Sequence, residues 1–178
     1  MAATATKLVP NEQHFHIPGP LNGLSLFLRF LPSAQTAKPR RAVLYVHGAT
    51  FPSALSIAHR FDGRSWRDAL NDAGFDVWGL DFYGFGHSDR YPEMAQAPAD
   101  NAPLLVAEDA AKQVETAARF ILAHQDLHKL SLISHSWGSM PACRFAGAHP
   151  ALVDRIVLFG PIARRAPRRY EAAPKFPA

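Results

Sequence analysis

A serine lies at a sharp turn between a predicted strand and a predicted helix. Residues 130–133 are an apolar run typical of a strand, and a helix-like stretch begins at Met140. Between them, Ser134-His135-Ser136-Trp137-Gly138 matches G-x-S-x-G except that serine replaces the first glycine. Such a turn exposes a serine hydroxyl at the top of a sheet, where a nucleophile is useful. The alternative is an ordinary turn with an incidental serine, because serine and glycine are common in turns.

Two upstream segments have the same strand-then-loop form. Residues 41–46 form a short apolar run that ends in His47-Gly48-Ala49, and residues 75–80 lead into Asp81. Short apolar runs without a period are typical of strands buried on both faces of a parallel sheet. Strand–helix alternation along the chain then predicts an α/β fold, with a mostly parallel sheet and helices on both faces.

These segments, in this order, resemble the α/β-hydrolase family. The resemblance is carried by His47-Gly48, by residues 81–89 as D-x-x-G-x-G-x-S-D, and by residues 134–138 as the nucleophile elbow. Residues 154–160 look like the family's sixth strand. The resemblance implies that residues 1–163 form the N-terminal part of a hydrolase core, followed by a basic, proline-rich tail at residues 164–178.

The resemblance also implies roles for individual residues. Ser136 would be the nucleophile, and the backbone N–H groups of Ala49 and Trp137 would hold the oxyanion. A serine at this position argues against dehalogenase or epoxide hydrolase chemistry, for which the family uses aspartate. The substrate would be a small molecule with an ester or related acyl bond. The other implied site residues are the supporting His47, Gly48 and Gly138 and the pocket walls Phe51, Phe82 and Phe85.

The catalytic acid and base stay unassigned. In this family both follow the nucleophile in the chain, but the only later candidates are Asp154, Glu171 and His149, and none matches a family position. The sequence therefore predicts a truncated hydrolase that lacks the C-terminal strands. Two functions remain open: a serine hydrolase of acyl bonds, or a non-catalytic remnant or interaction module of the same fold. An open sheet edge would also favour self-association.

Other polar residues near these motifs have simpler interpretations. His135 is expected to pack beneath the site or to line the pocket, and Asp81 to fasten its own loop through backbone hydrogen bonds. His14 and His16 alternate on a strand, but no third ligand of suitable spacing accompanies them, so we expect no metal site. No glycine-rich phosphate loop opens a helix, and no cofactor is expected.

Composition indicates a soluble globular domain. Hydrophobic residues make up 48% of the chain and charged residues 19%, and no apolar run approaches the length of a membrane span. The one cysteine, Cys143, fits a reducing compartment, so a cytoplasmic location is expected, and its place on the elbow helix predicts burial. The arginines near the C-terminus have no interleaved aromatics, which favours a solvated linker over a nucleic-acid site.

The remaining elements follow from periodicity and turn residues. We expect strands at residues 12–17 and 24–31, and a helix that Ser65 or Asp62 caps and Gly74 stops. A longer helix is predicted over residues 103–124, where apolar residues recur at three- and four-residue spacing.

Overall fold

Four parallel strands form the centre of the sheet, and two antiparallel strands extend it on one side. The computed structural model describes residues 5–35 and 39–162. The strands are β1 (Gln13–Pro18), β2 (Ser25–Leu31), β3 (Arg41–Val46), β6 (Phe75–Asp81), β7 (Leu130–His135) and β8 (Val153–Phe159). They are ordered β1-β2-β6-β3-β7-β8. Strands β6, β3, β7 and β8 pair in parallel, whereas β1 and β2 are antiparallel to their neighbours. The predicted mostly parallel sheet is confirmed.

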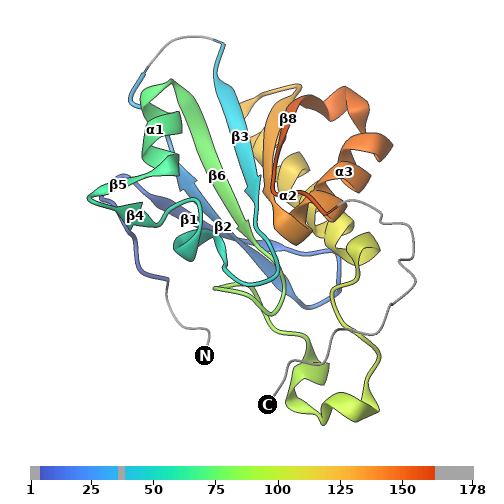
Figure 1. The fold of residues 1–178 in the computed structure, drawn as a ribbon. Helices are drawn as coiled ribbons and strands as arrows, with labels where there is room; N and C mark the ends of the chain where they lie inside the picture. Colours follow the sequence, from blue (N-terminus) through green and yellow to red (C-terminus); the bar gives the residue numbers. More distant parts are fainter. Residues whose placement is uncertain (1–4, 36–38, 163–178) are drawn as a thin grey trace, which may run out of the picture.

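Helices cover both faces of this sheet, as Figure 1 shows. The α-helices of the described part are α1 (Trp66–Asp72), α2 (Ala107–Gln125) and α3 (Ser139–Ala148). Short elements join them: the hairpin β4 (Arg60–Phe61) and β5 (Arg64–Ser65), and the 3-10 turns η1 (Ser53–Leu55), η2 (Pro92–Ala95), η3 (Pro98–Asp100), η4 (Ser136–Gly138) and η5 (Pro150–Leu152). None of the described helices is both long and apolar enough to cross a lipid bilayer.

Alternating side chains of β3 divide the core into two layers. Leu44 and Val46 belong to the larger cluster, which α2 and α3 cover. Val43 and Tyr45 point the other way, into a smaller cluster that Leu70 of α1 packs against. Because successive side chains of a strand point to opposite faces, an unbroken apolar run such as this requires a cover on each face.

The helix ends show how local sequence sets these elements. Ser65, rather than Asp62, caps α1: its hydroxyl accepts from Asp68 N while the Asp68 carboxylate accepts from Ser65 N. Helix α2 begins at Ala107, later than predicted, because Leu105 has a left-handed φ of 54° that a helix cannot include. The apolar spacing alone did not reveal this break.

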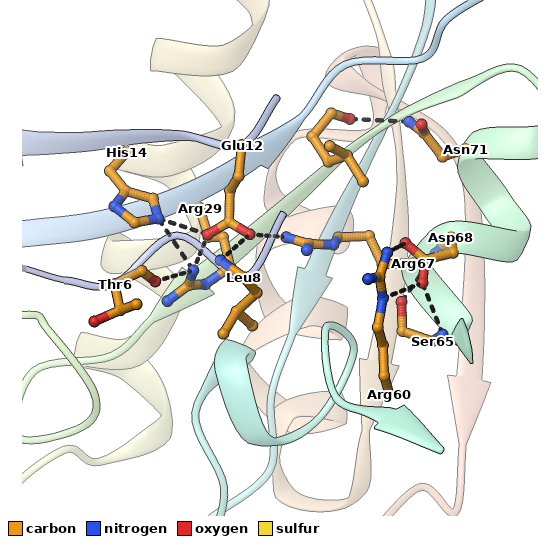
Figure 2. A network of polar contacts seen from close by, with 11 residues as sticks. Thr6, Leu8, Glu12, His14, Arg29, Arg60, Ser65, Arg67, Asp68 and Asn71 are labelled. Carbon is orange, nitrogen blue, oxygen red and sulfur yellow. Dashed lines mark hydrogen bonds and ion pairs between the residues drawn. The ribbon is translucent and has the colours of Figure 1, made fainter. Parts of the chain in front are cut away.

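A buried charged cluster ties the N-terminal segment to β2 and α1 (Figure 2). Glu12 is fully buried, and its carboxylate accepts from Arg29 Nη1 and from Leu8 N at 3.2 Å. Arg67 Nη1 lies 2.9 Å from Glu12 Oε2, as an ion pair without hydrogen-bond alignment. Burial lowers the pKa of both arginines to about 10, so they remain charged at neutral pH. One carboxylate therefore neutralises part of the charge of two buried cations.

The far edge of the sheet is unlike the rest. Strand β8 is the last strand in the order, and its residues Val157 and Phe159 are 50% and 59% exposed. Its apolar side chains have the composition of an interior parallel strand.

The prediction that Cys143 is buried was wrong, because it lies on the exposed side of α3. The predicted tail at residues 164–178 lies outside the described residues.

Replacing Glu12 with glutamine is expected to destabilise the protein strongly. The Glu12→Gln change leaves Arg29 and Arg67 buried without their counter-charge, for which the expected cost is about 3–5 kcal/mol of unfolding free energy. Urea denaturation followed by circular dichroism measures it. The matched control is Asp72→Asn, which breaks an ion pair at the surface. In this pair the side chain of Arg64 is 63% exposed and that of Asp72 is 69% exposed. Equal losses in the two variants would contradict the role assigned to the buried cluster.

Candidate active site

Ser136 occupies a strained turn directly after β7. Its φ is +50°, in the left-handed region that few residues other than glycine adopt. The hydroxyl of Ser139, in the first turn of α3, donates to Ser136 O at 2.7 Å and holds this conformation. Ser134 is fully buried, so a small residue is required two positions before Ser136. The local geometry is that of a serine presented at the carboxyl edge of a sheet.

Two glycines let the loop after β3 touch this turn. A Cβ atom at Gly138 would collide with the carbonyl oxygen of His47, and one at Gly48 would lie 3.2 Å from Ser136 Cβ. Gly138 thus lies against the backbone of His47, and Gly48 lies close to Ser136 and His135, so a side chain at either position would force the two segments apart. The close approach follows from the parallel pairing of β3 and β7, in which Val46 is opposite Ser134.

His47 fixes the loop after β3 to the end of β6. Its ring is fully buried: Nδ1 is 2.6 Å from Gly48 O, and Nε2 accepts from Phe82 N at 3.1 Å. These partners require the neutral ring with the proton on Nδ1. Burial lowers the pKa of His47, although the Gly48 carbonyl and Asp81 oppose the shift. The residue is therefore built into the scaffold beneath Gly48 and Ala49.

The motif at residues 81–89 is a set of hydrogen bonds rather than a reactive group. The Asp81 carboxylate accepts from Ser53 N at 2.8 Å and from His87 N at 3.1 Å, as predicted for a residue that fastens its own loop. Ser88 Oγ donates to Asp81 O and accepts from Phe27 N at 2.7 Å. The Asp89 carboxylate accepts from Ser25 N at 2.7 Å. The motif thus ties the loop after β6 to the start of β2.

An apolar cavity of about 360 Å³ opens beside the Ser136 turn. Both proposed oxyanion donors, Ala49 and Trp137, line it, and Phe85 contributes one wall. Phe82 does not line it: this ring is fully buried behind the wall, 5.7 Å from the Trp137 ring centre. Phe51 lines a separate hollow of about 330 Å³ instead. One of the three predicted wall residues therefore faces the first cavity.

Most of the wall comes from residues that sequence reasoning missed. They lie in the long connection between β6 and α2, and they are Tyr83, Gly84, Tyr91, Met94, Leu104 and Leu105. Figure 1 shows this connection, with η2 and η3, projecting from the carboxyl end of the sheet in yellow-green. Its length was the available signal, because long loops in compact domains are commonly functional.

His135 and His149 both have partners other than the Ser136 hydroxyl. The His135 ring stacks on Phe159 at 5.3 Å, facing the Phe51 hollow. His149 pairs with Glu115 at 3.1 Å, at the far end of the ten-residue helix α3, which places it about 15 Å along the helix from Ser136. Within residues 5–35 and 39–162, no hydrogen bond joins a histidine ring to Ser136 Oγ. The same part of the chain contains no cluster of three potential metal ligands.

Acid is expected to destabilise the fold through His47. The unfolded chain protonates this residue near its ordinary pKa of 6.5, whereas the folded form resists protonation because burial lowers its pKa. The unfolded state therefore binds more protons below pH 6.5, and the free energy of unfolding falls there by at most about 1.4 kcal/mol per pH unit. Denaturation midpoints from pH 7 to pH 5 measure this. His47→Gln should make the free energy of unfolding depend less on pH, whereas the control His128→Gln, at an exposed residue, should not. An unchanged pH dependence in His47→Gln would refute the role of His47.

Solved structures with the same fold are hydrolases of several kinds. An esterase from Thermogutta terrifontis aligns over 88% of this chain and 48% of its own, with 20% identity and a TM-score of 0.63. An epoxide hydrolase from Vigna radiata aligns over 92% and 44%, with 14% identity and a TM-score of 0.62. The thioesterase domain of the curacin biosynthetic pathway aligns over 82% and 43%, with 17% identity and a TM-score of 0.57. At these identities the likeness shows the fold alone.

The chain spans less than half the length of each of these structures. No protein with a curated description matches the sequence. The family model for the alpha/beta hydrolase fold matches residues 41–174, which include the β3 loop, the motif at residues 81–89 and the Ser136 turn. By this match, together with its sheet order, the chain belongs to the α/β-hydrolase fold family.

Proposed function

We propose that Ser136 is the nucleophile of an acyl-transfer reaction on an ester or related acyl bond of a small molecule. The observation that carries the proposal is the left-handed backbone of Ser136 at the end of β7, next to a cavity lined by Ala49 and Trp137. Strain of this kind is retained where the surrounding structure enforces it, and it gathers at functional sites. Gly48 and Gly138 support it by letting the loop after β3 pack closely against the Ser136 turn.

The chemistry follows from these positions. Ser136 Oγ would attack the substrate carbonyl carbon, and the carbonyl electron pair would move onto its oxygen. Backbone N–H groups of Ala49 and Trp137 would donate to that oxyanion, an effect of roughly 3 kcal/mol per donor in such sites. A general base must take the serine proton and return it to the leaving group, whose bond to the acyl carbon breaks.

The family membership is compatible with several reactions, and the residue at position 136 separates them. Serine forms an acyl-enzyme with esters and thioesters. Two of the similar structures, an esterase and a thioesterase, are named for reactions on such bonds. The family resemblance implies that epoxide hydrolases and dehalogenases carry an aspartate, not a serine, at the nucleophile position. We therefore place acyl transfer ahead of epoxide or halide chemistry for this chain.

The second candidate is a non-catalytic protein of the same fold. One observation favours it: no histidine of the described segments hydrogen-bonds to Ser136 Oγ. Without a base, a serine hydroxyl is a poor nucleophile at neutral pH. The two candidates differ in whether Ser136 reacts at all, so the test must report on adduct formation as well as on turnover.

Butylboronic acid tests the nucleophile without requiring turnover. Its boron should become tetrahedral by bonding to Ser136 Oγ, with one boron oxygen in the place of the oxyanion, and ¹¹B NMR reports this change directly. Ser136→Ala should abolish the signal. The matched control Ser134→Ala removes a buried hydroxyl two residues away and should retain it. A tetrahedral signal that persists in Ser136→Ala, or no signal in the parent chain, would refute the nucleophile role.

The same variants separate reactive geometry from full activity. The 178-residue chain should hydrolyse nitrophenyl acetate only slowly, and Ser136→Ala should change that rate little, because oxyanion stabilisation and binding alone leave roughly a thousandfold acceleration over water. Rapid turnover that disappears in Ser136→Ala would show that a base is present, with His87, His135 and His149 the first residues to replace.

We also propose that β8 pairs with a second copy of the chain. No described strand lies on the outer side of β8, and its side chains are more exposed than those of the other parallel strands. Charged residues occupy the start of β8, at Asp154 and Arg155, whereas residues 156–159 are apolar and exposed. An apolar edge of this kind readily accepts another strand. Antiparallel pairing of β8 with itself about a two-fold axis would give a closed dimer.

Sedimentation velocity tests this association. Val157→Lys places a charge on the exposed half of β8 and should shift the population to the monomer, because edge lysines oppose strand pairing. Leu21→Lys is the control, since Leu21 is similarly exposed but lies in the turn between β1 and β2. A parent chain that stays monomeric at high protein concentration would contradict the proposal.

We also propose a cytoplasmic location for the protein. The chain has one cysteine, Cys143, and its side chain is exposed. An exposed free thiol persists most readily in a reducing compartment.

A further inference from the structure

Helix α2 carries one fully buried glutamine on its otherwise apolar inner face. Gln113 is 1% exposed, and its neighbours on that face are Ala110, Val114 and Ala117. A polar side chain in such a position is costly unless its hydrogen bonds are made. The partners that Gln113 finds therefore indicate what the residue is for.

Both partners of Gln113 are walls of the cavity beside Ser136. Gln113 Oε1 accepts from Tyr83 N at 2.9 Å, and Gln113 Nε2 donates to the Tyr91 hydroxyl at 3.3 Å. The two tyrosine rings meet edge to face, with centres 5.4 Å apart. One amide thus joins the turn after β6 to the loop that contains η2 and fixes the distance between two parts of the wall.

Both tyrosine hydroxyls are engaged in hydrogen bonds within the protein. Tyr83 donates its hydroxyl to Leu24 O at 3.3 Å, and the Tyr91 hydroxyl is held by Gln113. Among the residues that the structure describes, no charged side chain lines the cavity. Ring faces and the side chains of Met94 and Leu104 remain to contact a ligand. The surface offered is mainly apolar, and it includes Ala49 and Trp137.

Size limits the ligand further. The cavity volume of about 360 Å³ lies near the lower end of the roughly 300–1,000 Å³ found for small-molecule sites. Leu105, with its left-handed φ of 54°, closes the wall where the loop meets α2. A compact chain fits this space.

We infer that this cavity binds the acyl part of the substrate as a straight, uncharged chain of medium length, and that Gln113 is the positioning residue that sets its shape. The inference rests on the proposed acyl-transfer site, because that site decides which end of the ligand lies at Ser136. Gln113 acts through Tyr83 and Tyr91 and does not touch the ligand itself.

Non-hydrolysable straight-chain amides test the inference. Propanamide through octanamide carry the acyl chain and a carbonyl oxygen, and binding to the 178-residue chain is followed through tryptophan fluorescence, since Trp137 lines the cavity. Affinity should rise about threefold to fourfold per methylene until the cavity is filled, and then level off. Affinity that does not depend on chain length would overturn the substrate class.

Two glutamines of the same helix provide a matched pair of variants. Gln113→Met should reduce the factor by which affinity rises with each added methylene at least twofold. Gln125→Met should not change it, although Gln125 also holds buried partners, accepting from Trp78 Nε1 at 3.0 Å and donating to Asp76 at 2.7 Å. A purely structural role would lower the affinity for every amide equally. An unchanged gain per methylene in Gln113→Met would overturn the positioning role.

Two further variants keep the test decisive if Gln113→Met does not fold. Tyr91→Phe removes only the hydroxyl that Gln113 holds, and it should weaken the dependence on chain length. Leu104→Trp, at a rim residue that is 39% exposed, should make the affinity level off at a shorter chain. If both variants keep the parent's dependence of affinity on chain length, the inference is overturned.

The outcomes also separate this inference from the proposed function. Amide binding requires no reaction, so it is measured independently of the boronate adduct. Normal amide binding without a boronate adduct would refute the nucleophile alone. A boronate adduct on Ser136 without chain-length dependence would refute the acyl cavity alone.

Discussion

The structure around the candidate site depends on a backbone contact between the ends of two parallel strands. Gly138, after β7, lies against the carbonyl oxygen of His47, after β3. Only residues without a Cβ permit this distance. Because β3 and β7 are held in register by their hydrogen bonds, the contact fixes the Ser136 turn against the loop that carries Ala49. Ser136 has its left-handed backbone within this closely packed turn.

Buried polar groups in this region serve the backbone of the loops. The neutral ring of His47 joins Gly48 to Phe82, and Asp81 holds the amides of Ser53 and His87. Each arrangement satisfies groups that would otherwise be costly to bury. The loops that follow β3 and β6 are thereby held to each other. This rigidity is what an oxyanion site requires, since its donors must be in place before charge develops.

The two edges of the sheet are stabilised to different degrees. On one side β1 and β2 extend the sheet, and Glu12 anchors the N-terminal segment to Arg29 and Arg67. On the other side β8 keeps apolar side chains exposed. Interior parallel strands are normally covered on both faces. The contrast makes β8 the edge that the proposed pairing with a second copy would cover.

The sequence by itself determined the elements with a local signal. Apolar runs located β3, β6, β7 and β8, and the pattern around Ser136 located the turn, because strand burial and tight turns restrict composition locally. Tertiary structure alone decided the rest. Leu105 broke the predicted start of α2, Phe82 lay behind the wall rather than in it, and Gln113 reached Tyr83 and Tyr91 across the fold. Those outcomes depend on which segments pack together, and contacts between residues 30 positions apart leave no pattern in the local sequence.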